Sequence, residues 1–517
     1  MIAQEQPTSL TLAHLLDLAA AEDPARLLYR FGDENCGCGE LRDASLRIAA
    51  ALSGLGVKRG DAVVLLVTHH IALARIWFAA ARLGAFVVPL NVDIPAAAMA
   101  GIVQGMDPAV IATQPEFALQ AEALRAAAPR AAFLDLLHLP EEDAVDQAGA
   151  VHWSDTAMVL GSSGSTGIPK RIVLSHRYVI HIAQEQAKAR GIAPGEVLYS
   201  PLPVFHINAV TTTLISALLA RTVGAFDAKF SARAFWDRCR HYDARHVSLI
   251  GSMIPKLHAL PVRENDARQP LRTILTSPSQ PEIIAAMKAR FGVRFIYAFG
   301  LTEATPMIGP DAEETLPPGS TGRAGPWFEV ELHDEHDEPV PEGAVGEIVC
   351  RPRAPGVMFS GYLGNPEATA RALRGLWFHT GDLGRRLPGG CYEFTGRAAD
   401  RLRRGGENIS AHEVEAVLLL IPGVSEAAAH NVVGSASEDI RVVIVTAEGA
   451  SVEARTVAEF AARHLPRFAQ PRYLEFAQAL PRAASDHLRR SELIAQGVGP
   501  QAVDLFELRK GGGAPAP

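Results

Sequence analysis

Apolar segments with helical spacing alternate with short β-rich runs over the first part of the chain. The helical pattern covers residues 41–55 and 72–83, and the short runs cover residues 62–67, 86–89 and 109–112. The alternation extends roughly over residues 43–135. It predicts a layered α/β unit with parallel strands.

A second alternation of the same kind covers roughly residues 155–300. Its expected buried strands are at residues 158–160, 197–199, 247–250 and 295–297. Because segments of helical pattern separate these runs, we expect a second layered α/β subdomain, again with parallel strands.

The pattern changes after Gly319 to short strands interrupted by glycine and proline, which predicts a small β-barrel or antiparallel module. Helical pattern returns near Pro366. We expect α/β fold class, with a large N-terminal domain over residues 1–396 and a smaller, mobile α+β domain over residues 397–500. Residues 501–517 are expected to be a tail that is flexible at its end.

Composition favours small-molecule chemistry in a globular protein. The 517 residues are 48% hydrophobic, and the formal net charge of -8 provides no basic field for nucleic acid or an anionic membrane. No apolar run approaches the roughly 18 residues of a membrane helix, and the start MIAQEQPTSL lacks a signal core. We therefore expect a cytoplasmic location.

The five cysteines are expected to be reduced thiols. Only Cys36 and Cys38 are close in sequence, whereas Cys239, Cys350 and Cys391 are scattered without metal-ligand spacing. The close pair could help to hold a metal. With no histidine or second cysteine pair nearby, two structural thiols are the favoured interpretation.

Residues 162–170, SSGSTGIPK, follow a buried strand and combine hydroxyls, flexible glycines and one cation. The hydroxyls belong to Ser162, Ser163, Ser165 and Thr166, the glycines are Gly164 and Gly167, and the cation is Lys170. This pattern favours phosphate binding. The Walker spacing is absent, and Pro169 opposes the immediate helix that a P-loop needs. A serine- and glycine-rich surface loop is the alternative.

The loop resembles the phosphate-binding signature of the adenylate-forming superfamily, which includes acyl-CoA synthetases, adenylation domains and luciferases. Further segments match that superfamily's signatures in the same order: PLPVFHINAV, FGLTEAT, FHTGDLG and TGRAADRLRRGGENIS. The resemblance extends from about residue 10 to 495. Connecting segments such as VMFSGYLGNPEATARALRGLWFHTGDLGRR are similar to a subgroup typified by crotonobetaine/carnitine-CoA ligases.

The resemblance implies a set of substrate-binding residues in the large domain. His206 would shape the acid site, Phe299 would stack on adenine next to Gly300, Thr302 would bind the α-phosphate, Glu303 would ligate Mg²⁺, and Asp382 and Arg397 would hold the ribose. The glycine-rich adenine turn of the family is here Ser277, Pro278 and Ser279, which are bulkier and more polar.

In the small domain, the resemblance implies that the turn of Gly405, Gly406, Glu407 and Asn408 approaches CoA in the second half-reaction. Arg403 and Arg404 are candidates to assist. A solvated basic run is the alternative for these arginines, and it precedes a helix that Ser410 would cap with Glu413 three residues later.

Two departures from the family pattern stand out. Where the family has a lysine that bridges carboxylate and α-phosphate, this chain has His487, with Asp486 at the preceding glycine position. No lysine occurs between Lys288 and Lys510, so only reorientation of Arg489 or Arg490 could supply a neighbouring fixed cation. The hinge position, which is often acidic or lysine in the family, aligns here with Ala399, and Asp400 follows it.

We therefore expect a ligase that uses ATP and Mg²⁺ to convert a carboxylic acid to an acyl-adenylate, with CoA as the expected acceptor. The altered signature motivates one alternative, an adenylate-forming enzyme with a carrier-protein thiol or an amine as acceptor, or with an unusual acid such as nitrite, as in diazotases. A second alternative is a nucleotide-binding homologue without turnover. The sequence leaves the acid and the oligomeric state open.

The altered signature yields a first prediction, that His487 partly replaces the missing lysine. Loss of one preorganised donor costs roughly 10²- to 10³-fold in rate, and an imidazolium beside phosphate is favoured below its pKa of about 6.5. His487→Ala should therefore slow adenylation, and the wild-type rate should fall as the pH rises through the imidazole pKa. ATP–pyrophosphate exchange measures both. Full activity of the variant, or a flat pH profile, contradicts the hypothesis.

Overall fold

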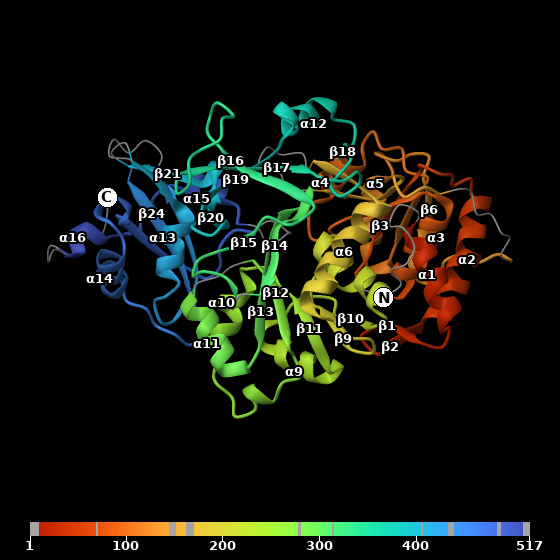
Figure 1. The fold of residues 1–517 in the computed structure, drawn as a ribbon, viewed down its shortest axis with the longest axis horizontal. Coiled ribbons are helices and arrows are strands. Elements are labelled where there is room, and N and C mark those ends of the chain that lie inside the picture. Colours follow the sequence, from red (N-terminus) through yellow and green to blue (C-terminus); the bar gives the residue numbers. More distant parts are fainter. Residues whose placement is uncertain are drawn as a thin grey trace.

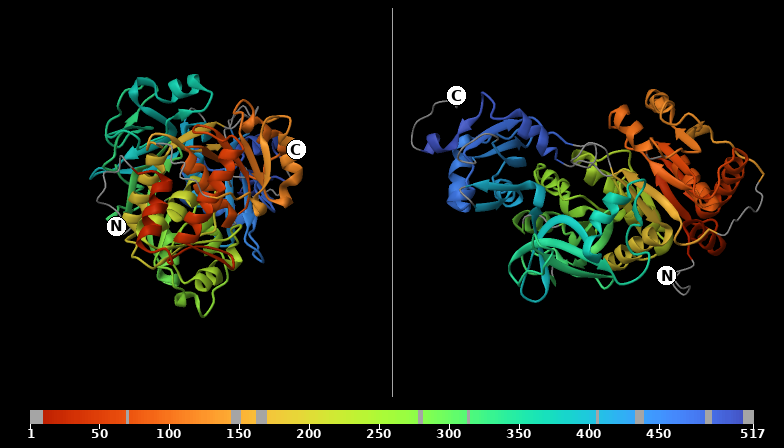
Figure 2. Two further views of the ribbon diagram at one scale, coloured as in Figure 1. Left: turned by 90° about the vertical axis from the view of Figure 1, so that its right-hand side faces the viewer. Right: turned by 90° about the horizontal axis from the view of Figure 1, so that it is seen from above.

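The computed structural model describes residues 10–68, 71–143, 151–161, 170–277, 281–312, 315–404, 407–432, 439–482 and 488–509. Two large mixed sheets, one antiparallel sheet and a small C-terminal lobe make up the fold. The N-terminal elements and the C-terminal lobe lie at opposite ends of the molecule, with the remaining sheets between them (Figures 1 and 2).

The first sheet has seven strands in the order β18-β8-β7-β4-β3-β5-β6. These strands are β3 (Ala62–Leu66), β4 (Phe86–Pro89), β5 (Val110–Thr113), β6 (Ala132–Asp135), β7 (Thr156–Gly161), β8 (Arg171–Ser175) and β18 (Gly361–Tyr362). The helices of this region are α2 (Cys38–Gly54), α3 (Ile71–Leu83), α4 (Ala96–Val103) and α5 (Ala118–Leu124). The strands from β7 to β6 pair in parallel, whereas β8 pairs antiparallel with both β7 and β18.

The second sheet has eight strands in the order β14-β13-β12-β11-β9-β10-β1-β2. They are β1 (Leu27–Phe31), β2 (Glu34–Gly37), β9 (Val197–Ser200), β10 (Val223–Phe226), β11 (Ala244–Ser248), β12 (Thr273–Thr276), β13 (Arg294–Leu301) and β14 (Ala304–Ala312). Its helices include α1 (Leu12–Glu22), α6 (His176–Arg190), α9 (Ala232–Tyr242), α10 (Met253–His258) and α11 (Pro281–Phe291).

Local signals in the sequence set the ends of α6. The Ser175 side chain accepts a hydrogen bond from the Tyr178 amide at the start of the helix, and Gly191 takes a left-handed conformation at its end, with φ of 62°. This helix follows directly on β8 of the first sheet, and its Tyr178 hydroxyl reaches the Thr302 carbonyl between β13 and β14 of the second sheet.

The predicted strands exist, but their distribution between sheets differs from the expectation. Strand β7, expected in the second α/β unit, belongs to the first sheet, and β1 and β2, which precede the first pattern, form the edge of the second. The strand expected at residues 247–250 is β11 (Ala244–Ser248), which begins and ends earlier. Hydrophobic pattern identifies a buried strand but not its partner, because pairing depends on contacts distant in sequence.

The antiparallel module expected after Gly319 is a five-stranded sheet in the order β15-β20-β19-β17-β16. Its strands are β15 (Gly322–Arg323), β16 (Phe328–His333), β17 (Val345–Pro352), β19 (Phe378–Arg386) and β20 (Cys391–Arg397). Helix α12 (Pro366–Ala372) begins where the sequence indicated, with the Asn365 side chain as its cap.

The C-terminal lobe is an α+β unit, as expected. A hairpin of β21 (Arg401–Arg404) and β22 (Glu407–Ser410) leads into a four-stranded sheet of β23 (Val424–Asn431), β24 (Ile440–Thr446), β25 (Tyr473–Ala477) and β26 (Val503–Asp504). Its helices are α13 (Ala411–Leu418), α14 (Ala454–His464), α15 (Arg490–Gln496) and α16 (Leu505–Arg509). Ser410 caps α13 by accepting from the Glu413 amide, which confirms the predicted capping residue.

The large domain and the C-terminal lobe have separate hydrophobic cores. The main core draws on residues from 10 to 392, whereas the core of the C-terminal lobe draws on residues from 402 to 505. All five cysteines are free and buried, as predicted for reduced thiols. Within the described ranges, no helix has both the length and the apolar character needed to cross a membrane.

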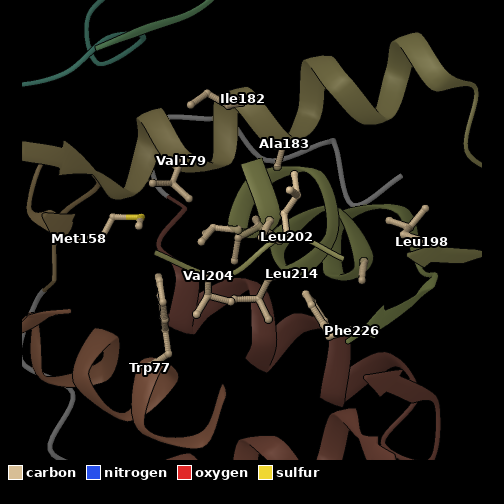
Figure 3. Packing of buried hydrophobic residues seen from close by; sticks show 14 of the residues in the cluster. Trp77, Met158, Val179, Ile182, Ala183, Leu198, Leu202, Val204, Leu214 and Phe226 are labelled. Atoms are coloured by element: carbon tan, nitrogen blue, oxygen red, sulfur yellow. The ribbon is translucent and has the colours of Figure 1, made fainter. Parts of the chain in front are cut away.

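The main core is continuous between the two large sheets. Figure 3 shows Trp77 of α3, Val179 of α6, Leu214 of the segment after β9, and Phe226 of β10 packed in one cluster. Because helices of both α/β units contribute to this cluster, the two units share one interior.

Phe226 provides a second prediction, about the free energy of unfolding. Its ring is fully buried and stacks on Phe31 with centroids 4.8 Å apart. Phe226→Ala should therefore destabilise the large domain by roughly 3–5 kcal/mol through lost burial and a residual cavity. Denaturant unfolding measures this, with Leu119→Ala, at an 87% exposed side chain, as the control. Similar small losses in both variants would contradict the prediction.

Candidate functional site

A tight turn between β13 and β14 carries the carboxylate expected to bind the metal. Leu301 pairs with Ala304, so Thr302 and Glu303 form a two-residue turn between the strands. The Glu303 side chain points into the protein and the residue is 7% exposed. Burial raises the pKa of its carboxyl group, because desolvation disfavours the charged form.

Three hydrogen bonds hold this turn in place. The Tyr178 hydroxyl donates to the Thr302 carbonyl at 3.2 Å, and the Phe359 amide donates to the Glu303 carbonyl at 2.8 Å. The Tyr362 hydroxyl donates to Oε1 of Glu303 at 2.9 Å. Both the backbone and the carboxylate of the turn are therefore fixed by partners on other elements.

Lys170 lies beside the same turn. Its Nζ is 4.8 Å from the centroid of the Tyr362 ring, and its positive charge, like that of Arg397, favours the ionised form of Glu303. The other phosphate-loop candidates, Ser162, Ser163, Gly164, Ser165, Thr166 and Gly167, lie outside the described residues. Lys170, at the described end of the loop, therefore lies near Glu303, the candidate metal-binding carboxylate.

Asp382 and Arg397, the two ribose candidates, are partners across adjacent strands. They pair in the register of β19 and β20, and Nε of Arg397 is 3.3 Å from Oδ1 of Asp382. The Asp382 amide donates to Oγ1 of Thr380 at 3.0 Å. Asp382 is 5% exposed, and burial raises the pKa of its carboxyl group to about 6, although Arg397 opposes the shift.

Phe299, the aromatic residue expected to face adenine, is buried against Phe394 of β20. The rings of Phe299 and Phe394 have centroids 5.8 Å apart, and the Phe394 ring makes an edge contact with His412 at 5.5 Å. Gly300 is exposed next to Phe299, where an added Cβ would lie 2.5 Å from Oγ1 of Thr305. Only glycine fits at this close approach.

Ser277 of the substituted adenine turn is exposed directly after β12. A Cβ added at Gly251 would lie only 2.6 Å from the hydroxyl oxygen of Ser277. Pro278 and Ser279 lie outside the described residues. The turn and the loop after β11 therefore meet closely at Ser277.

His206, the candidate for the acid site, precedes a short helical segment. Its ring lies 4.9 Å from that of Phe205, and the following chain includes a π-helix, η3 (Val210–Ile215). The fully buried Arg190 donates to the Thr212 carbonyl in this π-helix at 2.7 Å. Because π-helical turns are often found at functional sites, the segment after His206 is a suitable wall for a substrate pocket.

The two arginines proposed to assist CoA binding differ in environment. The backbone of Arg403 exchanges hydrogen bonds with the Asn431 side chain at 2.9 and 2.7 Å, and the residue is exposed. Arg404 instead donates to the Gln470 carbonyl at 2.8 Å and lies 3.5 Å from Asp439. These contacts favour a structural role for Arg404 and leave Arg403 as the more suitable candidate.

The predicted CoA turn is shorter than the four residues expected. Arg404 pairs with Glu407, so Glu407 belongs to β22 rather than to the turn. Gly405 and Gly406, between the two strands, lie outside the described residues.

A cavity of about 210 Å³ lies between the two parts of the chain. Phe394 and Gly396 of the large domain line one side, His412 and Arg490 of the C-terminal lobe line the other, and Arg397 and Asp400 lie at the junction. The ribose candidate Arg397 thus borders a space that the C-terminal lobe closes.

The arginines near the missing lysine are engaged in ion pairs. Arg490 pairs with Glu415 and lies 3.2 Å from Oδ1 of Asp400 at the expected hinge. Arg489 pairs with Glu492 at 2.6 Å. His487 lies outside the described residues. Either arginine would have to give up these partners before it could replace the lysine.

An ion-pair cluster joins the C-terminal lobe to helix α10. Glu426 of β23 lies 3.4 Å from Nζ of Lys256 and also pairs with Arg482, whose Nε is 3.1 Å from the carboxylate. Arg482 forms a β-bridge with Leu488. The cluster therefore connects the lobe to α10, and Arg482 is held beside Leu488.

Glu303 is suited to bind Mg²⁺ together with a nucleotide. The described residues contain no group of three or more histidine, cysteine or acidic side chains that could hold a metal ion. Mg²⁺ characteristically uses one or two carboxylates together with substrate phosphates and water. A single buried carboxylate beside a lysine fits that requirement.

The two tyrosines that support the turn, Tyr178 and Tyr362, carry no functional signal in the sequence. Tyr362 lies in the GYLGNPEAT segment, which carried the family resemblance without a role for the tyrosine, and Tyr178 lies within a helical pattern with no distinguishing signal. Both contacts with the turn are long-range, so the sequence alone gave no distance between these residues and Glu303.

The chain matches the family described as AMP-binding enzyme over residues 16–363, and that described as AMP-binding enzyme C-terminal domain over residues 413–486. Crotonobetaine/carnitine-CoA ligases of Shigella dysenteriae and Escherichia coli are 30% identical to it over 476 and 479 residues, covering 88% of this chain and 92% of each relative.

Solved structures share the fold. An anthranilate CoA ligase in complex with anthranoyl-AMP has a TM-score of 0.87 at 21% identity, covering 96% of this chain and 99% of its own. An O-succinylbenzoate CoA synthetase from Bacillus subtilis, in complex with ATP and magnesium ion, has a TM-score of 0.82 at 22% identity, covering 93% and 98%. The arrangement of a large α/β domain and a small C-terminal domain is thereby confirmed.

The raised pKa of Asp382 gives a third prediction. Its folded-state pKa of about 6 exceeds the ordinary 3.8, so the folded protein binds a proton that the unfolded chain lacks between these values. The contribution of this group to stability therefore falls as the pH rises through about 6. Asp382→Asn should raise Tm at pH 7.5, corresponding to roughly 1–3 kcal/mol, and the gain should shrink at pH 5.

Calorimetric Tm values at the two pH values measure this effect. Asp337→Asn is the control, because Asp337 is paired with Arg374 at the surface and its carboxyl pKa is lowered by that hydrogen bond. This control should not gain stability at pH 7.5. A lower Tm for Asp382→Asn at pH 7.5 would show that the buried carboxylate is net stabilising.

Proposed function

Because the chain belongs to the family of AMP-binding enzymes, we propose that it is an acid–thiol ligase, which activates a carboxylic acid with ATP and passes the acyl group to CoA. The relatives named as crotonobetaine/carnitine-CoA ligases and the neighbours named as CoA ligases support this reaction. The carboxylic acid and CoA are thus its substrates, and ATP with Mg²⁺ supplies the activation.

The charged residues expected to bind the nucleotide lie close together in this chain. The phosphate-loop cation Lys170, the buried carboxylate Glu303 and the ribose candidate Arg397 are near enough for both cations to influence the Glu303 carboxyl group. Glu303 in turn influences Asp382. A nucleotide with its phosphates near Lys170 and its ribose near Asp382 fits this cluster.

In the first half-reaction, an oxygen of the substrate carboxylate attacks the α-phosphorus of ATP. The bond from that phosphorus to the bridging oxygen breaks, and pyrophosphate leaves with the electron pair. Mg²⁺ bound at Glu303 would neutralise phosphate charge. Lys170 and Thr166 would hold phosphate oxygens, Thr302 the α-phosphate, and His487 the reacting centre.

Asp382 and Arg397 would position the nucleoside, with the Asp382 carboxylate accepting from the ribose hydroxyls. Phe299, Gly300 and Ser277 would border the adenine. Since Phe299 already packs on Phe394 and is 9% exposed, its ring would offer adenine an edge or a partial face rather than a free surface.

In the second half-reaction, the sulfur of CoA attacks the acyl carbon, the bond from that carbon to the AMP oxygen breaks, and AMP leaves. Gly405, Gly406 and Glu407 would approach the CoA arm, with Arg403 as the accessible cation. His206 and the π-helix after it would border the acid.

We place the boundary between the two domains at residues 396 and 397. Separate hydrophobic cores on either side and the cavity at Arg397 support this division. The C-terminal domain, which would move between the half-reactions, continues past the expected end at residue 500, because β26 and α16 pack into its core instead of forming a tail. The five free thiols support a cytoplasmic location.

A different acceptor is the second candidate function. His487 in place of the family lysine, with Arg489 and Arg490 engaged elsewhere, favours an altered first half-reaction. An unusual acid such as nitrite would fit this departure in the first half-reaction, and a carrier-protein thiol or an amine would change the acceptor in the second.

A fourth prediction tests the proposed function directly. ATP–pyrophosphate exchange across a panel of carboxylic acids, with nitrite included, should show exchange with one or a few acids. The same acids incubated with ATP and CoA should give a thioester detected by mass spectrometry. Exchange without a thioester would favour another acceptor, and absence of exchange with every acid would overturn acid activation.

A further inference from the structure

The contacts of the Glu303 turn point to a role for a residue to which the sequence motifs gave none. A carboxylate that is removed from water needs hydrogen-bond donors to keep one orientation. Tyr362 supplies such a donor to Oε1 of Glu303 at 2.9 Å. The geometry of the carboxylate therefore depends on where Tyr362 is held.

Tyr362 is fixed from several sides. It is 6% exposed, and its backbone pairs with Ile172 of β8. Its amide donates to Oγ1 of Thr369 at 2.9 Å, and its ring packs against Phe359 with centroids 5.1 Å apart. The hydroxyl is thus directed at Glu303 by a rigid surrounding structure.

The same strand pairing links Tyr362 to the phosphate loop. Strand β8 begins at Arg171, immediately after Lys170, and the Lys170 ammonium lies 4.8 Å from the Tyr362 ring centroid. One side chain therefore contacts the candidate metal-binding carboxylate through its hydroxyl and the candidate phosphate-binding cation through its ring.

We propose that Tyr362 is a positioning residue that sets the placement of the Glu303 carboxylate relative to Lys170, so that Mg²⁺ and the nucleotide phosphates meet in one geometry. Groups that orient a metal-binding side chain control metal affinity without touching the metal. The inference rests on the proposed function, because Glu303 is the expected Mg²⁺ ligand there.

Tyr178 offers a matched control within the same turn. It is fully buried, and its hydroxyl donates to the Thr302 carbonyl at 3.2 Å. Tyr178→Phe and Tyr362→Phe each remove one hydroxyl from the turn. Only the second removes a donor to the carboxylate, and the phenylalanine ring keeps the contact with Lys170.

The fifth prediction compares these two variants. In Tyr362→Phe, the free Mg²⁺ concentration for half-maximal ATP–pyrophosphate exchange should rise about 10- to 100-fold, with most of kcat recovered at saturating Mg²⁺. Tyr178→Phe should keep the wild-type Mg²⁺ dependence, although its Tm falls. Equal Mg²⁺ dependence in wild type and Tyr362→Phe, or equal shifts in both variants, would overturn the proposal.

A binding measurement separates this proposal from the reaction itself. Calorimetry of ATP binding with and without Mg²⁺ should show that Mg²⁺ strengthens ATP binding in wild type and Tyr178→Phe, and does so less in Tyr362→Phe. If no acid supports exchange, acid activation fails, yet this comparison still tests Tyr362. An equal gain from Mg²⁺ in all three proteins would refute the positioning role.

Discussion

Burial of two carboxylates, Glu303 and Asp382, is the constraint on which the arrangement of the site depends. Desolvation raises the pKa of both, so each needs donors or cations from elsewhere to keep its charge. Three sheets meet to supply them. The Glu303 turn belongs to the eight-stranded sheet, Tyr362 to the seven-stranded sheet, and the pair of Asp382 and Arg397 to the antiparallel sheet.

The sequence predicts where helices and strands lie along the chain better than it predicts which strands pair. Apolar pattern located β4 and β13, and polar capping located the start of α13. It did not place β1 beside β10 or β7 in the first sheet, because strand pairing depends on residues far apart in the chain.

Candidate site residues were identified mainly through resemblance, and the structure adds their environment. Asp382 and Arg397 are separated by fifteen positions in sequence. They lie opposite each other because β19 and β20 form an antiparallel hairpin. Arg403 and Arg404 look equivalent in sequence, but only Arg404 meets Asp439 and Gln470. Long-range contacts of this kind carry no local signal, so the sequence could not distinguish the two arginines.

The double pairing of Glu426 bears on how the lobes separate. If the C-terminal lobe turns away from α10, Glu426 loses Lys256 but keeps Arg482 within its own lobe. Glu426 then still has a cation beside it, and the lost contact with Lys256, between partly solvated groups, is worth only about 0–1 kcal/mol. Added salt would weaken that contact further, so ionic strength would tilt the balance toward the open arrangement without disturbing either hydrophobic interior.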